Sequence, residues 1–64
     1  MRLNGATFGM HNIQVTYTDP SGLDEQSMID CAKNDLDLQD DEYSGVDVTY
    51  PLGVKTLGTV IFWR

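Results

Sequence analysis

The spacing of apolar residues changes twice along this chain, and that change most constrains the fold. Residues 13–18 (Ile-Gln-Val-Thr-Tyr-Thr) and residues 46–50 (Val-Asp-Val-Thr-Tyr) alternate apolar with polar side chains. This period of two, in β-branched and aromatic residues, predicts two half-buried strands. The side chains expected to face the core are Ile13, Val15, Tyr17, Val46, Val48 and Tyr50.

Between these strands, residues 23–36 have the spacing of a helix. Their apolar side chains recur about one turn apart and form a single stripe of Met28, Ile29, Ala32 and Leu36. Ser21, followed three residues later by Asp24, resembles a capping box that begins this helix. The face opposite the stripe is expected to be solvated and carries Gln26, Asp30, Lys33, Asn34 and Asp37.

Two further segments complete the predicted sheet. Residues 55–64 are expected to form the last strand, and residues 2–8 form a short first strand that Gly5 weakens. The sequence therefore predicts an α+β fold, in which a small antiparallel sheet of three to four strands has one helix packed on one face. The order of elements is ββαββ, or βαββ if the first strand does not form.

A single helix covers a single face of such a sheet, so the other face is expected to contact water or a partner. Polar residues predicted on this open face are Gln14, Thr16, Thr18, Asp47 and Thr49. The last strand is apolar on both faces near its end, so the open face also receives either Ile61 with Trp63 or Val60 with Phe62. Those pairs tolerate water less well than the threonines do.

The length of 64 residues predicts a single acidic domain over residues 1–64 with a thin core, because a domain of this size buries only about 60% of the surface of its unfolded chain. Cys31 is the only cysteine, so no disulfide can form within the chain. No leader and no long apolar run is recognised. The expectation is a cytoplasmic protein that does not contact membranes.

The charge of the chain is both large and unevenly distributed. Ten acidic residues against four basic ones give a net charge of −6, and all ten lie between Asp19 and Asp47, where Lys33 is the only base. That stretch therefore carries −9. Negative charge of this size repels phosphate backbones and anionic membranes and favours basic partners. Direct nucleic-acid binding, which normally needs a basic surface, is not expected.

Patterns that carry chemistry are weak in this sequence. A nucleophile pair of His11 and Cys31 would be needed for catalysis, but Cys31 lies beside the apolar stripe of the helix. Residues 35–46 resemble a calcium loop in their acidity, yet the sixth position is Asp40 rather than glycine and the twelfth is Val46. No phosphate-binding glycine pattern occurs. We therefore expect no enzyme activity, no cofactor and no tight metal site.

The acidic stretch has two interpretations. It is either a solvated surface that maintains solubility or a recognition surface for a basic partner. The candidate partner-binding residues are Asp30, Asp37, Asp40, Asp41, Glu42, Asp47 and Trp63. Trp63 itself either closes the edge of the core or anchors a partner on the open sheet face.

In size, acidity and the combination of a single helix with a few strands, the chain resembles the small acidic proteins that phages encode to inhibit host machinery, of which anti-CRISPR proteins are the largest group. These families share no motif, so no functional residue can be transferred to this sequence. The resemblance implies an inhibitor that acts in the host cytoplasm by placing its acidic face in a basic groove meant for DNA or RNA. The alternative function is a structural or assembly module that homodimerises or docks through the open sheet face and Trp63.

Overall fold

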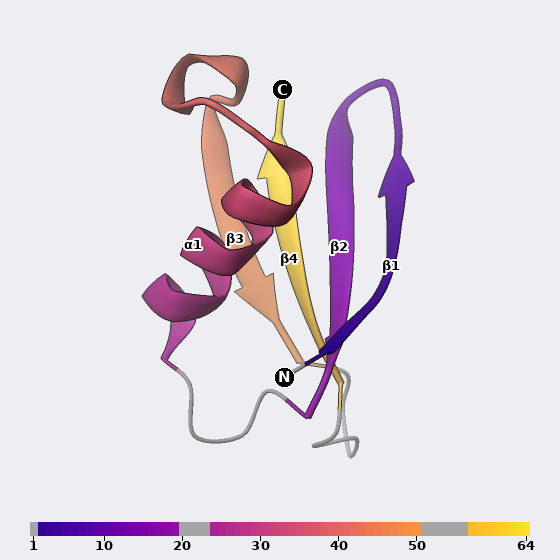
Figure 1. Cartoon of the computed structure of the whole chain (residues 1–64). Coiled ribbons are helices and arrows are strands. Elements are labelled where there is room, and N and C mark those ends of the chain that lie inside the picture. Colours follow the sequence, from indigo (N-terminus) through magenta and orange to yellow (C-terminus); the bar gives the residue numbers. More distant parts are fainter. Residues whose placement is uncertain (1, 20–23, 51–56) are drawn as a thin grey trace.

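The computed structural model describes residues 2–19, 24–50 and 57–64 of the chain. Within these residues the elements are β1 (Arg2–Phe8), β2 (Asn12–Thr18), α1 (Glu25–Leu36), a 3₁₀ helix η1 (Asp40–Glu42), β3 (Gly45–Thr49) and β4 (Leu57–Trp63). The four strands form one antiparallel sheet in the order β1-β2-β4-β3. Helix α1 lies on one face, over β3 and β4 (Figure 1). The predicted α+β class is confirmed, and η1 is an element that the sequence analysis did not include.

The pairing of β2 with β4 builds the centre of the core. Ile13 lies opposite Phe62 and Val15 opposite Val60. Among the described residues the buried core consists of Ile13, Val15, Tyr17, Met28, Ala32, Val60 and Phe62. The three inward residues predicted in β2 are thus confirmed, and the ambiguity in β4 is resolved: Val60 and Phe62 face the helix. Ile61 and Trp63 consequently lie on the open face.

Helix α1 begins later than predicted, at Glu25. The carboxylate of Asp24 accepts a hydrogen bond from the Ser27 N–H at 2.8 Å, so Asp24 is the N-cap residue. The prediction that Ser21 caps the helix is wrong because Asp24 occupies that position itself, and aspartate caps helices as well as serine does. Ser21 and Leu23 lie outside the described residues.

Helix α1 ends at a residue with left-handed backbone conformation, Asp37 (φ 54°). The Leu38 N–H then donates to the Lys33 carbonyl oxygen at 2.9 Å, a bond typical of the end of a helix. On the inner face of α1 the predicted apolar stripe is confirmed. Its members Met28 and Ala32 are buried, and Ile29 and Leu36 pack against the core.

One expectation from the sequence needs correction. Tyr50 was expected to face the core, but β3 ends at Thr49 and Tyr50 is 47% exposed, with its hydroxyl 3.3 Å from the Met28 sulfur. Cys31, which the sequence places beside the apolar stripe, lies on α1 and is exposed. The last strand begins at Leu57, and the first residues predicted for it, 55 and 56, lie outside the described residues.

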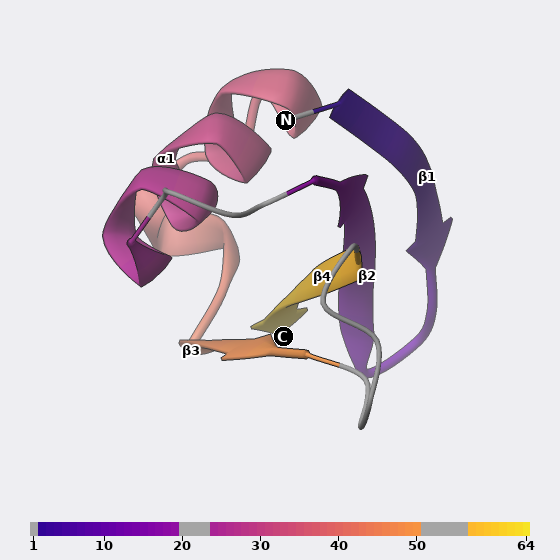
Figure 2. The same ribbon diagram turned by 90° about the horizontal axis from the view of Figure 1, so that it is seen from below.

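Strand β1 forms at the edge of the sheet farthest from β3 (Figure 2). It pairs with β2 from Arg2 opposite Thr18 to Phe8 opposite Ile13, with a bulge between Leu3 and Gly5. All seven of its residues are exposed. Within the described ranges, no helix has the length and apolar character that would let it cross a membrane.

Candidate functional site

Most of the acidic residues lie on or beside α1 and η1, and all ten in the chain are exposed. Residues 24–42 contain eight acidic side chains against the single base Lys33, a net charge of −7. In contrast, residues 2–18 contain no acidic side chain and one arginine, Arg2. The asymmetry seen in the sequence is therefore an asymmetry between parts of the folded domain.

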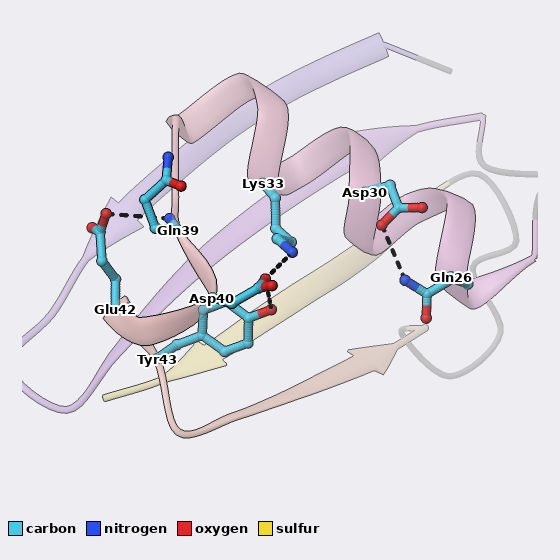
Figure 3. Close-up of polar contacts among 7 residues, drawn as sticks. All are labelled: Gln26, Asp30, Lys33, Gln39, Asp40, Glu42 and Tyr43. Atoms are coloured by element: carbon cyan, nitrogen blue, oxygen red, sulfur yellow. Dashed lines mark hydrogen bonds and ion pairs between the residues drawn. The ribbon is translucent and has the colours of Figure 1, made fainter.

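The single base of this region is engaged by one of its acids. Lys33 on α1 forms an ion pair with Asp40 at the start of η1, and the Tyr43 hydroxyl donates to the same carboxylate oxygen at 3.4 Å (Figure 3). The hydrogen bond with Lys33 lowers the pKa of Asp40, and the bond with Asp40 raises the pKa of Lys33. Asp40 therefore stays ionised, and the pair joins η1 to the outer side of α1.

The short helix η1 is held by its own backbone and side chains. The Gln39 N–H donates to the Glu42 carboxylate at 3.2 Å (Figure 3). The Glu42 N–H in turn donates to the Gln39 carbonyl oxygen at 3.0 Å. These two bonds close a single turn that presents Asp40, Asp41 and Glu42 in succession, all three exposed. The acidic segment that follows α1 thus contains a hydrogen-bonded turn.

On α1 itself, Asp30 accepts a hydrogen bond from the Gln26 side chain at 3.0 Å, one turn earlier on the exposed face (Figure 3). Asp37 is exposed at the helix end, between α1 and η1. Five of the six predicted acidic residues therefore lie on adjoining elements. We refer to these five as the acidic surface: Asp30, Asp37, Asp40, Asp41 and Glu42.

The sixth predicted acid, Asp47, lies elsewhere. Its neighbours Val46 and Val48 pack against the core, so Asp47 points from β3 to the open face of the sheet, away from α1. There the indole N–H of Trp63 donates to the Asp47 carboxylate at 2.9 Å. Asp47 and Trp63 form a second site, the open-face pair, which the sheet separates from the acidic surface.

A further carboxylate of α1 contacts the sheet. The hydroxyl of Tyr17, a buried residue of β2, donates to Asp35 at 2.6 Å. Burial and this hydrogen bond together raise the pKa of the Tyr17 hydroxyl well above its usual range. Asp35 therefore ties α1 to β2. The sequence offered no signal for this contact, because it depends on how the helix crosses the sheet.

Residues considered for chemistry are also placed by the structure. His11 lies in the turn between β1 and β2, Cys31 lies on α1, and both are exposed. In the part of the chain that the structure describes, no three His, Cys, Asp or Glu side chains come together as a metal site would require.

The chain matches no protein-family profile, and comparisons with curated proteins and with solved structures also found no match.

Proposed function

We propose that this chain is a non-catalytic binding protein whose acidic surface occupies a basic, nucleic-acid-binding site on a partner protein and blocks it. The observation that carries this proposal is the net charge of −7 over residues 24–42, with every acidic side chain exposed and Lys33 engaged by Asp40. Carboxylates pair with lysine and, in bidentate geometry, with arginine, the same side chains that bind phosphates. A surface rich in fixed carboxylates therefore suits a site built for DNA or RNA.

The geometry of the acidic surface favours recognition over simple solubility. Helix α1 has 12 residues and so extends for about 18 Å, and η1 continues the acidic run beyond its end. The bond between Gln39 and Glu42 closes η1 into a turn, and the ion pair of Lys33 and Asp40 joins this turn to α1. A surface that is ordered before binding loses less conformational entropy when a partner docks.

An inhibitory role is supported by the resemblance in size, acidity and simplicity to small phage-encoded inhibitors of the anti-CRISPR type. For such a protein the place of action is the cytoplasm of the host. Attraction between the acidic surface and a basic site also speeds association at low ionic strength. The expected complex forms quickly and weakens steeply as salt rises.

The test compares two variants with equal net charge. The first carries Asp40→Asn, Asp41→Asn and Glu42→Gln, which remove three charges from η1 and retain side chains of similar shape. The control carries His11→Lys, Gln14→Lys and Thr49→Lys, which add three charges at exposed positions outside the acidic surface. Both variants have a net charge of −3, so only the position of the change differs.

Wild type and both variants are immobilised and exposed to a lysate of the native host, and the captured protein is then purified for titration. We expect the captured partner to be a nucleic-acid-binding protein, and nucleic acid should compete with the chain for binding to it. The partner should bind the η1 variant at least about tenfold more weakly than wild type and should bind the control with nearly the affinity of wild type. Equal binding of wild type and the η1 variant, or a partner that binds the chain and nucleic acid simultaneously, would contradict the proposal.

The open-face pair supports a second candidate function, docking through the uncovered side of the sheet. Trp63 is 39% exposed, its N–H is already bonded to Asp47, and Ile61 lies on the same face. An ordered tryptophan of this kind anchors interfaces effectively. This candidate predicts that Trp63→Ala abolishes association and that salt has little effect on it.

A further inference from the structure

Strand β1 differs from every other strand in the described residues because all of its residues are exposed, whereas each of the other strands has residues that are buried or partly buried. Leu3 is 49% exposed and Phe8 is 65% exposed, although they lie opposite the buried Tyr17 and Ile13 of β2. The register therefore places both on the side of the sheet that carries α1, but α1 lies over β3 and β4 and does not reach them. The helix side of β1 is therefore an apolar strip that no helix or strand of the described residues covers.

The free edge of β1 carries only two of the features that usually prevent pairing with another strand, the charge of Arg2 and one bulge, and both lie at the beginning of the strand. Protected edges carry charges or proline, or they are short. Strand β3, at the other edge, has five residues and includes Asp47. Strand β1 has seven residues, no proline and no charge beyond Arg2. Its bulge ends at Gly5, so residues 5–8 are regularly paired with β2.

We propose that β1 pairs antiparallel with β1 of a second copy of this chain, which joins the two four-stranded sheets into one. A strand edge is complementary to itself in this arrangement, because a two-fold axis perpendicular to the sheet brings the same segment to both sides. The two helices then lie on the same face of the joined sheet. Phe8 of each copy approaches the beginning of the opposite β1, and the apolar strips of the two copies become continuous.

The charge distribution explains why two copies that each carry −6 can meet at this edge. Residues 2–18 contain no acidic side chain, whereas α1, η1 and β3 lie toward the far edge of the sheet. With β1 against β1, the two β4 strands are about 24 Å apart, five strand spacings, which exceeds the Debye length of about 8 Å at physiological salt. Antiparallel pairing also keeps the two Arg2 side chains at opposite ends. Pairing at β3 would instead bring two acidic regions together.

The experiment measures self-association of the full chain by sedimentation equilibrium and native mass spectrometry, from about 1 µM to about 1 mM. The test variant is Phe8→Lys, which places a charge on the apolar strip. The matched control is Met10→Lys, because Met10 is 88% exposed in the β1–β2 turn, outside the strand, and the change in charge is the same. Circular dichroism should show that both variants fold, because both positions are mostly exposed.

Wild type is expected to dimerise within this range, Phe8→Lys to weaken the dimer by about tenfold or more, and Met10→Lys and Trp63→Ala to dimerise like wild type. Added salt should strengthen the dimer or leave it unchanged, since it screens repulsion between the copies. As concentration increases, exchange of the backbone amides should slow in β1 and not in β3.

A wild-type chain that remains monomeric up to about 1 mM would overturn the inference, and so would a dimer that survives Phe8→Lys or is lost in Trp63→Ala. If the natural partner of β1 is a strand of a different protein, the purified chain should remain monomeric in this experiment, which would likewise overturn the inference. The variant with Asp40→Asn, Asp41→Asn and Glu42→Gln should still dimerise. Failure here is thus separate from failure of the proposed function.

Discussion

Strands β1 and β4 have the same length and the same neighbour, yet one is fully exposed and the other alternates between buried and partly exposed positions. Each has seven residues, and each pairs antiparallel with β2. Both also carry apolar side chains on the helix side of the sheet, Leu3 and Phe8 in β1, and Val60 and Phe62 in β4. Only the latter two are buried.

The difference lies in what covers each strand. Helix α1 packs over β3 and β4, and Tyr43 adds an edge-on aromatic contact to Phe62 with ring centres 5.1 Å apart. Strand β1 receives no such cover from the described residues. Apolar content therefore does not decide which strand belongs to the core of this small domain, and the position of its helix does. The strand order β1-β2-β4-β3 also separates the exposed apolar strand β1 from the acidic elements α1 and η1, because α1 lies over β3 and β4.

The largest expected effect compares one phenylalanine on each strand. Phe62→Ala removes a fully buried ring and should destabilise the domain by about 3–5 kcal/mol, which is enough to unfold most of a domain of this size. Phe8→Ala removes a ring that is 65% exposed and should change the free energy of unfolding by less than about 0.5 kcal/mol. Urea denaturation at a dilute protein concentration measures both. A loss of more than about 2 kcal/mol in Phe8→Ala would show that β1 belongs to the core after all.

A smaller effect is expected at Tyr17, where β2 is tied to the helix that covers β4. Tyr17→Phe removes the hydrogen bond to Asp35 and should cost about 1–2 kcal/mol at neutral pH. Because the folded state raises the pKa of the Tyr17 hydroxyl, the unfolded chain loses this proton first, near its ordinary pKa of about 10. The stability of wild type should therefore fall as pH rises above about 10.

Tyr17→Phe provides the control for this pH dependence, since it retains the ring and lacks the titrating group. Denaturation at several alkaline pH values should show a steeper loss of stability in wild type than in the variant. Parallel curves would mean that the hydroxyl is equally free to ionise in the folded and unfolded chain, which would contradict its burial against Asp35.

Much of this comparison could be predicted from the sequence, because periodicity reports local structure well. The inward residues of β2, the apolar stripe of α1 and the existence of β1 all follow from patterns within single segments. The prediction that Tyr50 faces the core was wrong because the alternation of apolar and polar residues continues one residue past the end of β3. The prediction that Ser21 caps α1 was wrong because serine and aspartate both suit the N-cap position. The sequence does not show whether Ser21 or Asp24 occupies it.

Features that join distant segments could not be predicted in this way. Charge alone predicts that Asp47 acts together with the acids of α1 and η1, but in the structure Asp47 pairs with Trp63, 16 residues away, on the opposite face of the sheet. The exposure of β1 depends on strand order and on which strands α1 covers. Neither property has a local sequence signal, because both arise from long-range pairing.

A substitution at the end of α1 should stabilise the helix that covers β4 and also remove one acidic side chain. Asp37 has a left-handed backbone conformation, in which a side chain is strained and glycine is not. Asp37→Gly should therefore stabilise the domain by about 0.5–1 kcal/mol, measured as a shift in the urea midpoint. Amide exchange should slow in β4 and remain unchanged in β1. If the same variant binds the partner more weakly, Asp37 is retained for recognition at the expense of stability.

The smallest expected effect lies at the start of α1. Asp24→Ala removes the acceptor for the Ser27 N–H and should lower the melting temperature by roughly a few degrees at pH 7. This hydrogen bond lowers the pKa of Asp24 in the folded state, so its contribution is present above the unfolded pKa of about 4 and disappears as pH falls below it. The difference between wild type and Asp24→Ala should therefore become smaller in acid, whereas the difference between Asp24→Asn, which keeps an uncharged acceptor, and Asp24→Ala should be the same in acid and at pH 7. If β1 and β4 lost amide protection equally in Asp24→Ala, the helix would not be what distinguishes the two strands.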